Sequence, residues 1–99
     1  MMFDIEYRFE EGTNNKHDLT LFALSTCGFC KRSMKFLKEK NIAFKFVYLD
    51  TFEREKKTEI KTQLKKKFNK RAVFPYLVIN EKEVVLGFTQ SEWEKALGL

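Results

Sequence analysis

Apolar and polar residues alternate near the start of the chain. Phe3, Ile5, Tyr7 and Phe9 are separated by charged residues, and this period of two predicts a strand with one face in water. Residues 19–24 then form a nearly continuous apolar run, which is expected of a central strand covered on both faces. The first quarter of the chain is therefore expected to hold two strands with different surroundings.

The segment between these two strands, residues 11–18, is polar and predicts a loop. Gly12, Asn14 and Asn15 are residue types that adopt left-handed backbone conformations in turns. His17, the single histidine of the chain, lies in the same loop. We expect it to be exposed there rather than to act as a catalytic base.

Two later segments repeat apolar residues every three to four positions, as amphipathic helices do. The first covers residues 31–40, and Asn41 marks its end. The second covers about residues 53–68, with Asp50 or Thr51 as its N-terminal cap. The apolar positions expected to face the core are Met34 and Leu37 in the first helix and Ile60, Leu64 and Phe68 in the second.

Three more strands and a last helix complete the pattern. Residues 43–49, 76–79 and 83–86 are rich in β-branched and aromatic residues, and the last two are joined by a short hairpin turn. Thr89 or Ser91 can begin a final helix, because each has a glutamate three residues later. The order strand, helix, strand in the first half implies a parallel crossover, with the intervening turn at the carboxyl end of the first strand.

That turn, TCGFC, contains both cysteines of the chain. Cys27 and Cys30 are three residues apart at the start of a helix, so they lie on one face and can form a small disulfide ring. Unpaired backbone N–H groups and the positive end of the helix dipole favour the thiolate at Cys27. We therefore predict that Cys27 is the nucleophile and that Cys30 is the resolving thiol.

Two other interpretations of the cysteine pair are weaker. A structural disulfide between residues three apart would close a very small loop and add little stability. A zinc site would need four ligands, and the chain has no second cysteine pair and a single histidine. We therefore expect no bound metal and favour redox chemistry.

Composition limits the organisation of the chain. Its 99 residues, 43% of them apolar, suit one domain, residues 1–99, in which residues 1–18 form an N-terminal strand and loop extension and residues 19–99 form the core. The apolar runs are too short to span a membrane, and the N-terminus does not resemble a signal peptide. We expect a cytoplasmic monomer with no membrane partner and no tightly bound cofactor.

The net charge of +5 is interpreted as diffuse. The lysines of the second helix form a solvated face, or else a positive rim that attracts an anionic thiol or an acidic partner protein. Because no recognised nucleic-acid-binding motif accompanies the charge, we expect no nucleic-acid partner.

The combination of TCGFC, Pro75 about 45 residues later and Gly87-Phe88 about twelve residues further on resembles the glutaredoxin and glutaredoxin-like redoxin family of the thioredoxin superfamily. The resemblance covers residues 19–97. It implies an α/β thioredoxin-like fold, with a mixed four-stranded core sheet, an extra N-terminal strand beside residues 43–49 and three flanking helices. It also implies a glutaredoxin-type oxidoreductase that acts on protein or small-molecule disulfides in electron transport.

In this family the proline is cis and lies beside the active-site cysteines, and the backbone before it pairs with the bound thiol substrate. Lys61 on the second helix is expected to hold a substrate carboxylate. The resemblance therefore implies substrate contacts at Val73, Phe74, Pro75, Gly87, Phe88, Thr89 and Lys61.

Glutathione-using relatives have a lysine before the cysteine motif and a double glycine where this chain has Gly87 and Phe88. We therefore expect glutathione to be a poor co-substrate compared with another low-molecular-weight thiol or a thioredoxin-reductase type of flavoenzyme. Expected partners are proteins that contain disulfides, with ribonucleotide reductase as one candidate recipient of electrons. The alternative class is a non-enzymatic module that binds a metal or a partner through the same fold.

Overall fold

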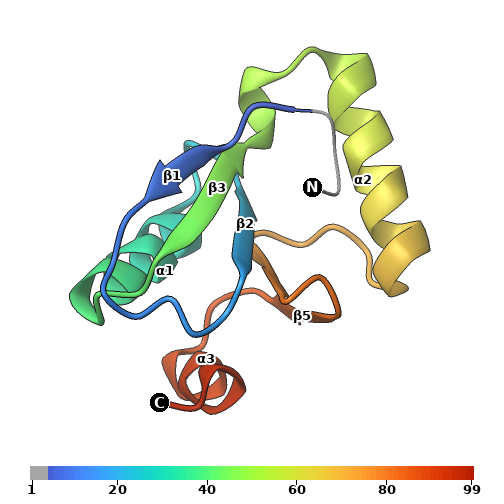
Figure 1. Cartoon of the computed structure of the whole chain (residues 1–99). Coiled ribbons are helices and arrows are strands. Elements are labelled where there is room, and N and C mark those ends of the chain that lie inside the picture. The colour runs from blue at the N-terminus through green and yellow to red at the C-terminus, as the bar shows by residue number, and fades with distance from the viewer. Residues whose placement is uncertain (1–4) are drawn as a thin grey trace.

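The computed structural model describes residues 5–99. A five-stranded sheet with the order β1-β3-β2-β4-β5 is flanked by three helices (Figure 1). The elements in chain order are β1 (Arg8–Glu10), β2 (Leu19–Ala23), α1 (Gly28–Glu39), β3 (Phe44–Tyr48), the 3-10 turn η1 (Leu49–Thr51), α2 (Arg54–Phe68), β4 (Tyr76–Ile79), β5 (Glu83–Leu86) and α3 (Gln90–Leu97).

The sheet is mixed, as predicted. β2 and β3 are parallel, whereas the pairs β1–β3, β2–β4 and β4–β5 are antiparallel. Because α1 connects the two parallel strands, the turn that precedes it lies at the carboxyl end of β2. This confirms the predicted position of the cysteine motif.

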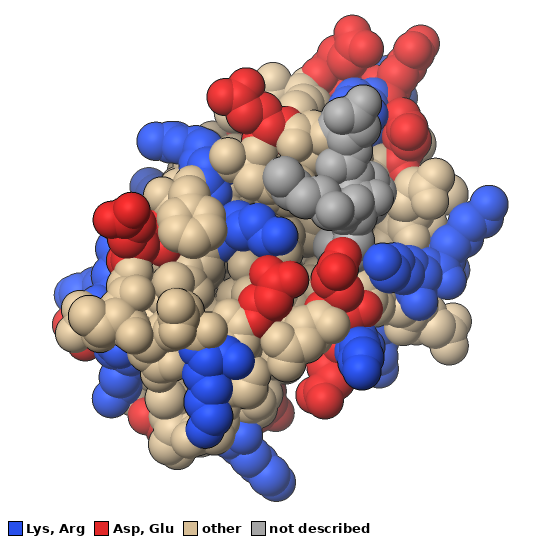
Figure 2. Space-filling view, viewed as in Figure 1, with Lys and Arg blue, Asp and Glu red and all other residues tan. Residues whose placement is uncertain are grey.

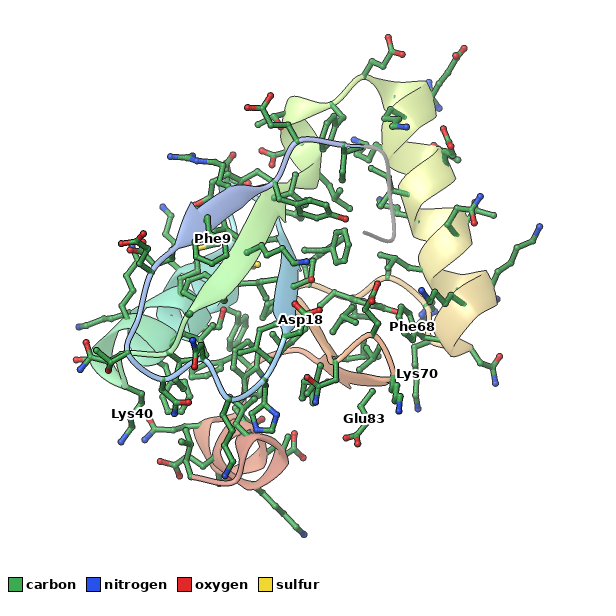
Figure 3. All side chains as sticks on the ribbon, in the orientation of Figure 1. Phe9, Asp18, Lys40, Phe68, Lys70 and Glu83 are labelled. Atoms are coloured by element: carbon green, nitrogen blue, oxygen red, sulfur yellow. The ribbon has the colours of Figure 1, made fainter. Side chains whose placement is uncertain are left out.

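The N-terminal strand pairs with β3, as the resemblance implied, with Arg8 opposite Phe46. It is shorter than predicted, and Phe3 lies outside the described residues. The prediction that Tyr7 and Phe9 share one buried face is wrong: Tyr7 packs into the cluster beneath α2, but Phe9 is 66% exposed. Phe9 lies on β1, the edge strand of the sheet (Figure 3).

Two hydrophobic clusters lie on opposite faces of the sheet. One is closed by α1 and α3 through residues such as Leu37 and Trp93. The other is closed by Ile60 and Leu64 of α2. All five residues of β2 are buried, because this strand contributes side chains to both clusters. The sheet is thus held as the middle of three layers, with the ends of its parallel strands free to carry a site.

The helix termini differ from the prediction. The N-cap of α2 is Glu53, without a side-chain hydrogen bond, because Asp50 and Thr51 belong to η1. Asp50 instead accepts hydrogen bonds from Ser25. Thr89 is the N-cap of α3, but its side chain makes no capping bond. Among residues 5–99, none of the helices combines the length and the apolar character needed to cross a membrane.

The loop before β2 is fixed by contacts that its composition does not reveal. Gly12 has no left-handed backbone; a Cβ at this position would lie 2.5 Å from the Asn41 carbonyl oxygen. Asn41 itself is left-handed, with φ of 55° after the end of α1. His17 is half-buried and its Nε2 donates to the Leu97 carbonyl (3.1 Å), so the prediction of an exposed histidine is wrong. This loop ties the N-terminal extension to the far end of α3.

Candidate active site

Cys27 occupies the junction between β2 and α1. The strand ends at Ala23, and the Cys27 N–H donates to the Leu24 carbonyl (3.2 Å), which closes a tight turn. Cys27 has an extended backbone (φ −90°, ψ 117°) and is the N-cap of α1. The helix therefore starts immediately after the cysteine, and the Cys27 side chain lies at the amino end of the helix.

The Cys27 sulfur acts as the capping group of the helix. The backbone N–H of Cys30 donates to Sγ of Cys27, with a distance of 3.1 Å between nitrogen and sulfur. A side chain that accepts from the third residue of the helix satisfies one of the free N–H groups of the first turn. An N–H donor interacts more strongly with a charged acceptor than with a neutral one, so this geometry stabilises negative charge on the sulfur.

Cys30 lies one turn inside the helix and is only 1% exposed. Its burial, together with hydrogen bonding to the Cys27 side chain, raises the pKa of the Cys30 thiol to about 12. Cys30 thus keeps its proton at neutral pH, while Cys27 is half-exposed and accessible to a substrate. The two sulfurs therefore have different surroundings.

A pair of residues that the sequence analysis did not identify fixes the loop in front of Cys27. The Asp50 carboxylate, in the 3-10 turn η1 that follows β3, accepts from the Ser25 backbone N–H (2.9 Å) and from the Ser25 hydroxyl. These hydrogen bonds lower the pKa of Asp50. Because the two partners are far apart in the sequence, only the parallel pairing of β2 and β3 brings them together.

The loop before β4 lies over the same core cluster as the cysteines. The Phe74–Pro75 peptide bond is cis, as the family resemblance implied. Phe74 packs against both hydrophobic clusters, and Cys27 packs against the one closed by α1 and α3. Val73 is 39% exposed, whereas Pro75 is buried. An exposed backbone segment thus precedes a buried proline at the edge of the site.

The segment after β5 is joined to this loop by hydrogen bonds. The Gly87 N–H donates to the Pro75 carbonyl, and the Trp93 Nε1–H donates to the Gly87 carbonyl, both at 2.9 Å. The ring centroid of Phe88 lies 5.1 Å from that of Trp93 and 5.7 Å from that of Phe36. Trp93 therefore holds the loop in position.

Lys61 reaches the same region from α2. Its Nζ lies 5.9 Å from the centroid of the Phe74 ring, within the range of a cation–π contact. The exposed Phe29 lies inside the cysteine motif, and the Arg32 guanidinium lies 4.5 Å from its ring centroid. The surface around the site is therefore both apolar and cationic.

The chain brings together most of the residues singled out from the sequence. The Pro75 and Gly87 backbones are hydrogen-bonded, Lys61 contacts Phe74, and Phe88 packs against the core cluster that Cys27 also touches. Thr89 is exposed at the start of α3. The roles of these residues in substrate binding stay predictions. Across residues 5–99, no three side chains of His, Cys, Asp or Glu lie close enough together to hold a metal ion.

Comparison with known proteins adds independent findings. The family model described as Glutaredoxin matches residues 19–84. The crystal structure of the glutaredoxin from Methanosarcina mazei Go1 is similar, with a TM-score of 0.80, 27% identity, and coverage of 96% of this chain and 90% of that one.

Two further solved structures are similar over most of their length. For Methanosarcina acetivorans methanoredoxin the TM-score is 0.77 and the identity 30%, with coverage of 89% of this chain and 90% of that one. For the Archaeoglobus fulgidus glutaredoxin (grx-1) the TM-score is 0.70 and the identity 25%, with coverage of 82% of this chain and 86% of that one. No curated protein matches this chain significantly.

Proposed function

Because this chain belongs to the glutaredoxin family, we propose that it is a dithiol oxidoreductase that reduces disulfides through Cys27 and Cys30. The family and the fold support thiol–disulfide oxidoreductase chemistry. The observation that carries the assignment of roles is the 3.1 Å contact from the Cys30 N–H to the Cys27 sulfur, beside a buried Cys30 thiol. One sulfur is thus accessible and accepts a hydrogen bond from a backbone N–H of the helix, and the other is buried.

In the first step the Cys27 thiolate attacks one sulfur of a substrate disulfide. A mixed disulfide forms, and the other substrate sulfur leaves as a thiolate that takes up a proton. In the second step Cys30 attacks Sγ of Cys27 and gives up its proton to the departing thiolate. The substrate gains two electrons and two protons, and the protein is left with a Cys27–Cys30 disulfide.

The raised pKa of Cys30 fits this sequence of events. Burial is its main cause, and hydrogen bonding to Cys27 and the charge of Cys27 contribute to it. Once the Cys27 sulfur is part of a mixed disulfide it carries no negative charge, so its electrostatic contribution to the raised pKa of Cys30 is lost. Cys30 therefore becomes easier to ionise at the stage when it has to act as a nucleophile.

Substrate binding is proposed at the two loops beside the cysteines. The backbone before Pro75 is exposed at Val73 and can pair with an extended substrate segment. Lys61, beside Phe74, can hold a carboxylate of the substrate. The proposed substrate-contacting residues are Val73, Phe74, Pro75, Gly87, Phe88, Thr89 and Lys61.

The protein must be reduced again after each turnover, and we propose that glutathione serves this step poorly. The start of α3 offers Thr89, Gln90 and Ser91 near the Phe88 ring, and none of them supplies a carboxylate for the ammonium group of glutathione. Another low-molecular-weight thiol or a thioredoxin-reductase type of flavoenzyme is the proposed electron donor. Disulfide-containing proteins, with ribonucleotide reductase as one candidate, are the proposed recipients in a reducing compartment such as the cytoplasm.

The test is reduction of the oxidised protein by glutathione and by a thioredoxin reductase with its nicotinamide cofactor, side by side, with insulin as the disulfide substrate. We expect insulin reduction with at least one donor, faster with the reductase, and none from the Cys27→Ser variant. If the pre-reduced protein cannot reduce insulin or hydroxyethyl disulfide, the proposal fails, and the fold serves a non-enzymatic binding module.

A further inference from the structure

The positive charge of this protein is concentrated in α2 and the segment that follows it. Residues 54–71 contain nine lysines and arginines but only two glutamates, whereas the rest of the chain contains ten cationic and twelve acidic side chains. The interpretation of the net charge as diffuse is therefore wrong. Lys and Arg side chains project from the side of the molecule that α2 forms (Figure 2).

Part of this charge surrounds a cleft of about 550 Å³. The cleft lies between the second half of α2 and the segment that returns to the sheet, where Phe68 and Lys70 lie in Figure 3. Its lining residues are Lys61, Thr62, Lys65, Lys66, Asn69, Arg71 and Ala72. The ion pairs within residues 5–99 join Lys38 to Glu10, Lys45 to Asp18 and Lys56 to Glu59, so the four cations of the cleft have no acidic partner in the described part of the chain.

Helix stability alone does not explain four cations at this place. Lysines in the last turn of a helix interact favourably with its dipole, which accounts for Lys65 and Lys66. Lys61 lies before the last turn, and Arg71 lies after the left-handed Asn69 that ends the helix. Lys61 and Lys65 are also four residues apart on one helix face, where like charges repel each other. An anionic occupant of the cleft would relieve this repulsion.

The cleft adjoins the proposed substrate loop. Arg71 and Ala72 directly precede Val73, and Lys61 contacts the Phe74 ring with its ammonium group. A molecule bound in the cleft is therefore next to the segment that leads to Pro75. A substrate that binds in the cleft and presents its disulfide to Cys27 would contact the cleft and the loop before Pro75 at the same time.

The distribution of the cations favours an occupant with several negative charges. One turn of helix, about 6 Å, separates Lys61 from Lys65, and Arg71 lies across the cleft on another segment. A single carboxylate can pair with one or two of these groups. Side chains that point to the same side of an extended peptide are about 6.6 Å apart, which is close to the spacing of Lys61 and Lys65. The lining residues include no aromatic side chain on which a nucleic-acid base could stack.

We propose that this cleft binds an acidic segment next to the reactive cysteine of a protein disulfide substrate. The inference rests on the proposed function, because it assigns a substrate class to the same site. Charge of this kind acts mainly on the rate of encounter, which complementary fields raise by about tenfold or more at low ionic strength.

The test uses the reduced full-length protein in single turnover, so that no electron donor is needed. Two peptide disulfides are compared, one with glutamates on both sides of its cysteine and one with glutamines at the same positions. The cleft variant is Lys65→Gln with Lys66→Gln and Arg71→Gln. The matched control is Lys16→Gln with Lys82→Gln and Lys95→Gln, three exposed positions outside the cleft that remove the same charge.

We expect the wild-type protein to reduce the glutamate peptide at least tenfold faster than the glutamine peptide at low salt, with the difference largely lost in 0.5 M NaCl. The cleft variant should lose the preference and the control should keep it. Equal rates for the two peptides, or an equal loss in the control, would overturn the inference. The inference would also be overturned if an oligothymidylate inhibited reduction of the glutamate peptide more strongly than a cysteine-free glutamate peptide of equal charge. That result would assign the cleft to nucleic acid.

Hydroxyethyl disulfide, which carries no charge, separates this inference from the proposed function. All three proteins should reduce it at the same rate. If they do and the peptide preference is absent, only the acidic-segment proposal fails. If none of them reduces it, the proposed function itself fails.

Discussion

Replacing Trp93 by phenylalanine should loosen the loop that carries Gly87 and Phe88. Trp93 is fully buried, its Nε1–H donates to the Gly87 carbonyl at 2.9 Å, and its ring packs edge-on against Phe88. Phenylalanine keeps an aromatic ring but has no donor. The Gly87 carbonyl would lose its partner, and a small cavity would open between α1 and α3.

The expected cost follows from these two losses. A hydrogen bond between uncharged groups contributes about 0.5–1.5 kcal/mol. Complete removal of a buried aromatic side chain costs about 3–5 kcal/mol, and removal of part of one costs about 1–2 kcal/mol. Trp93→Phe should therefore reduce the free energy of unfolding of the reduced protein by about 1.5–3.5 kcal/mol.

The assay is urea unfolding followed by far-UV circular dichroism, because Trp93 is the single tryptophan and the variant has no tryptophan fluorescence. Hydrogen exchange at the Gly87 amide, which donates to the Pro75 carbonyl, reports on the loop itself and should become faster. Tyr76→Phe is the control: it removes a buried hydroxyl that donates to the Lys70 carbonyl (3.1 Å) on the other face of the sheet. A loss in Trp93→Phe smaller than about 0.5 kcal/mol, the least expected for the hydrogen bond alone, together with unchanged exchange at Gly87, would refute the anchoring role.

Three other perturbations test further parts of the structure. Phe88→Gly combined with Ser91→Asp should speed reduction by glutathione about ten- to a hundredfold, and the expectation fails if the unmodified protein already uses glutathione as fast as a reductase. The pKa of the Cys30 thiol is 9.0 in the unfolded chain and about 12 in the folded protein, so between these pH values only the unfolded chain loses the proton. The free energy of unfolding of the reduced wild type, relative to Cys30→Ala, should therefore fall by about 1.4 kcal/mol per pH unit in this range. Urea midpoints of the two proteins that differ by a constant amount up to pH 10.5 would contradict this. Gly12→Ala should cost about 1–3 kcal/mol in urea unfolding, since its Cβ would lie 2.5 Å from a carbonyl oxygen, and an unchanged midpoint would show that the loop can move away.

Periodicity in the sequence was enough to place the elements that build the core. β2 appears in the sequence as a continuous apolar run, because the strand is buried on both faces. α2 appears through the i, i+4 spacing of Ile60 and Leu64, because one face of the helix is buried. The position of Cys27 at a strand–helix junction followed from the same patterns. These features depend on neighbours in the sequence, so one-dimensional reasoning can find them.

Contacts between distant residues could not be predicted in this way. The sequence does not indicate that Ser25 and Asp50 are partners, because each is a residue type that could equally cap a helix or form a turn with its own neighbours. The bond from Trp93 to Gly87 depends on the angle at which α3 returns to the sheet. Phe9 continued a regular alternation but is exposed, since burial depends on where the covering helix ends.

Trapping the intermediate on single-cysteine variants tests the assigned roles of Cys27 and Cys30 most directly. Cys30→Ser and Cys27→Ser are each incubated at pH 7.5 with a peptide disulfide, quenched with acid and analysed by mass spectrometry. We expect a stable mixed disulfide on Cys27 in Cys30→Ser and almost none on Cys30 in Cys27→Ser, because only Cys27 is accessible and contacts the helix N–H group. A mixed disulfide that accumulates on Cys30 in Cys27→Ser but not on Cys27 in Cys30→Ser would contradict it.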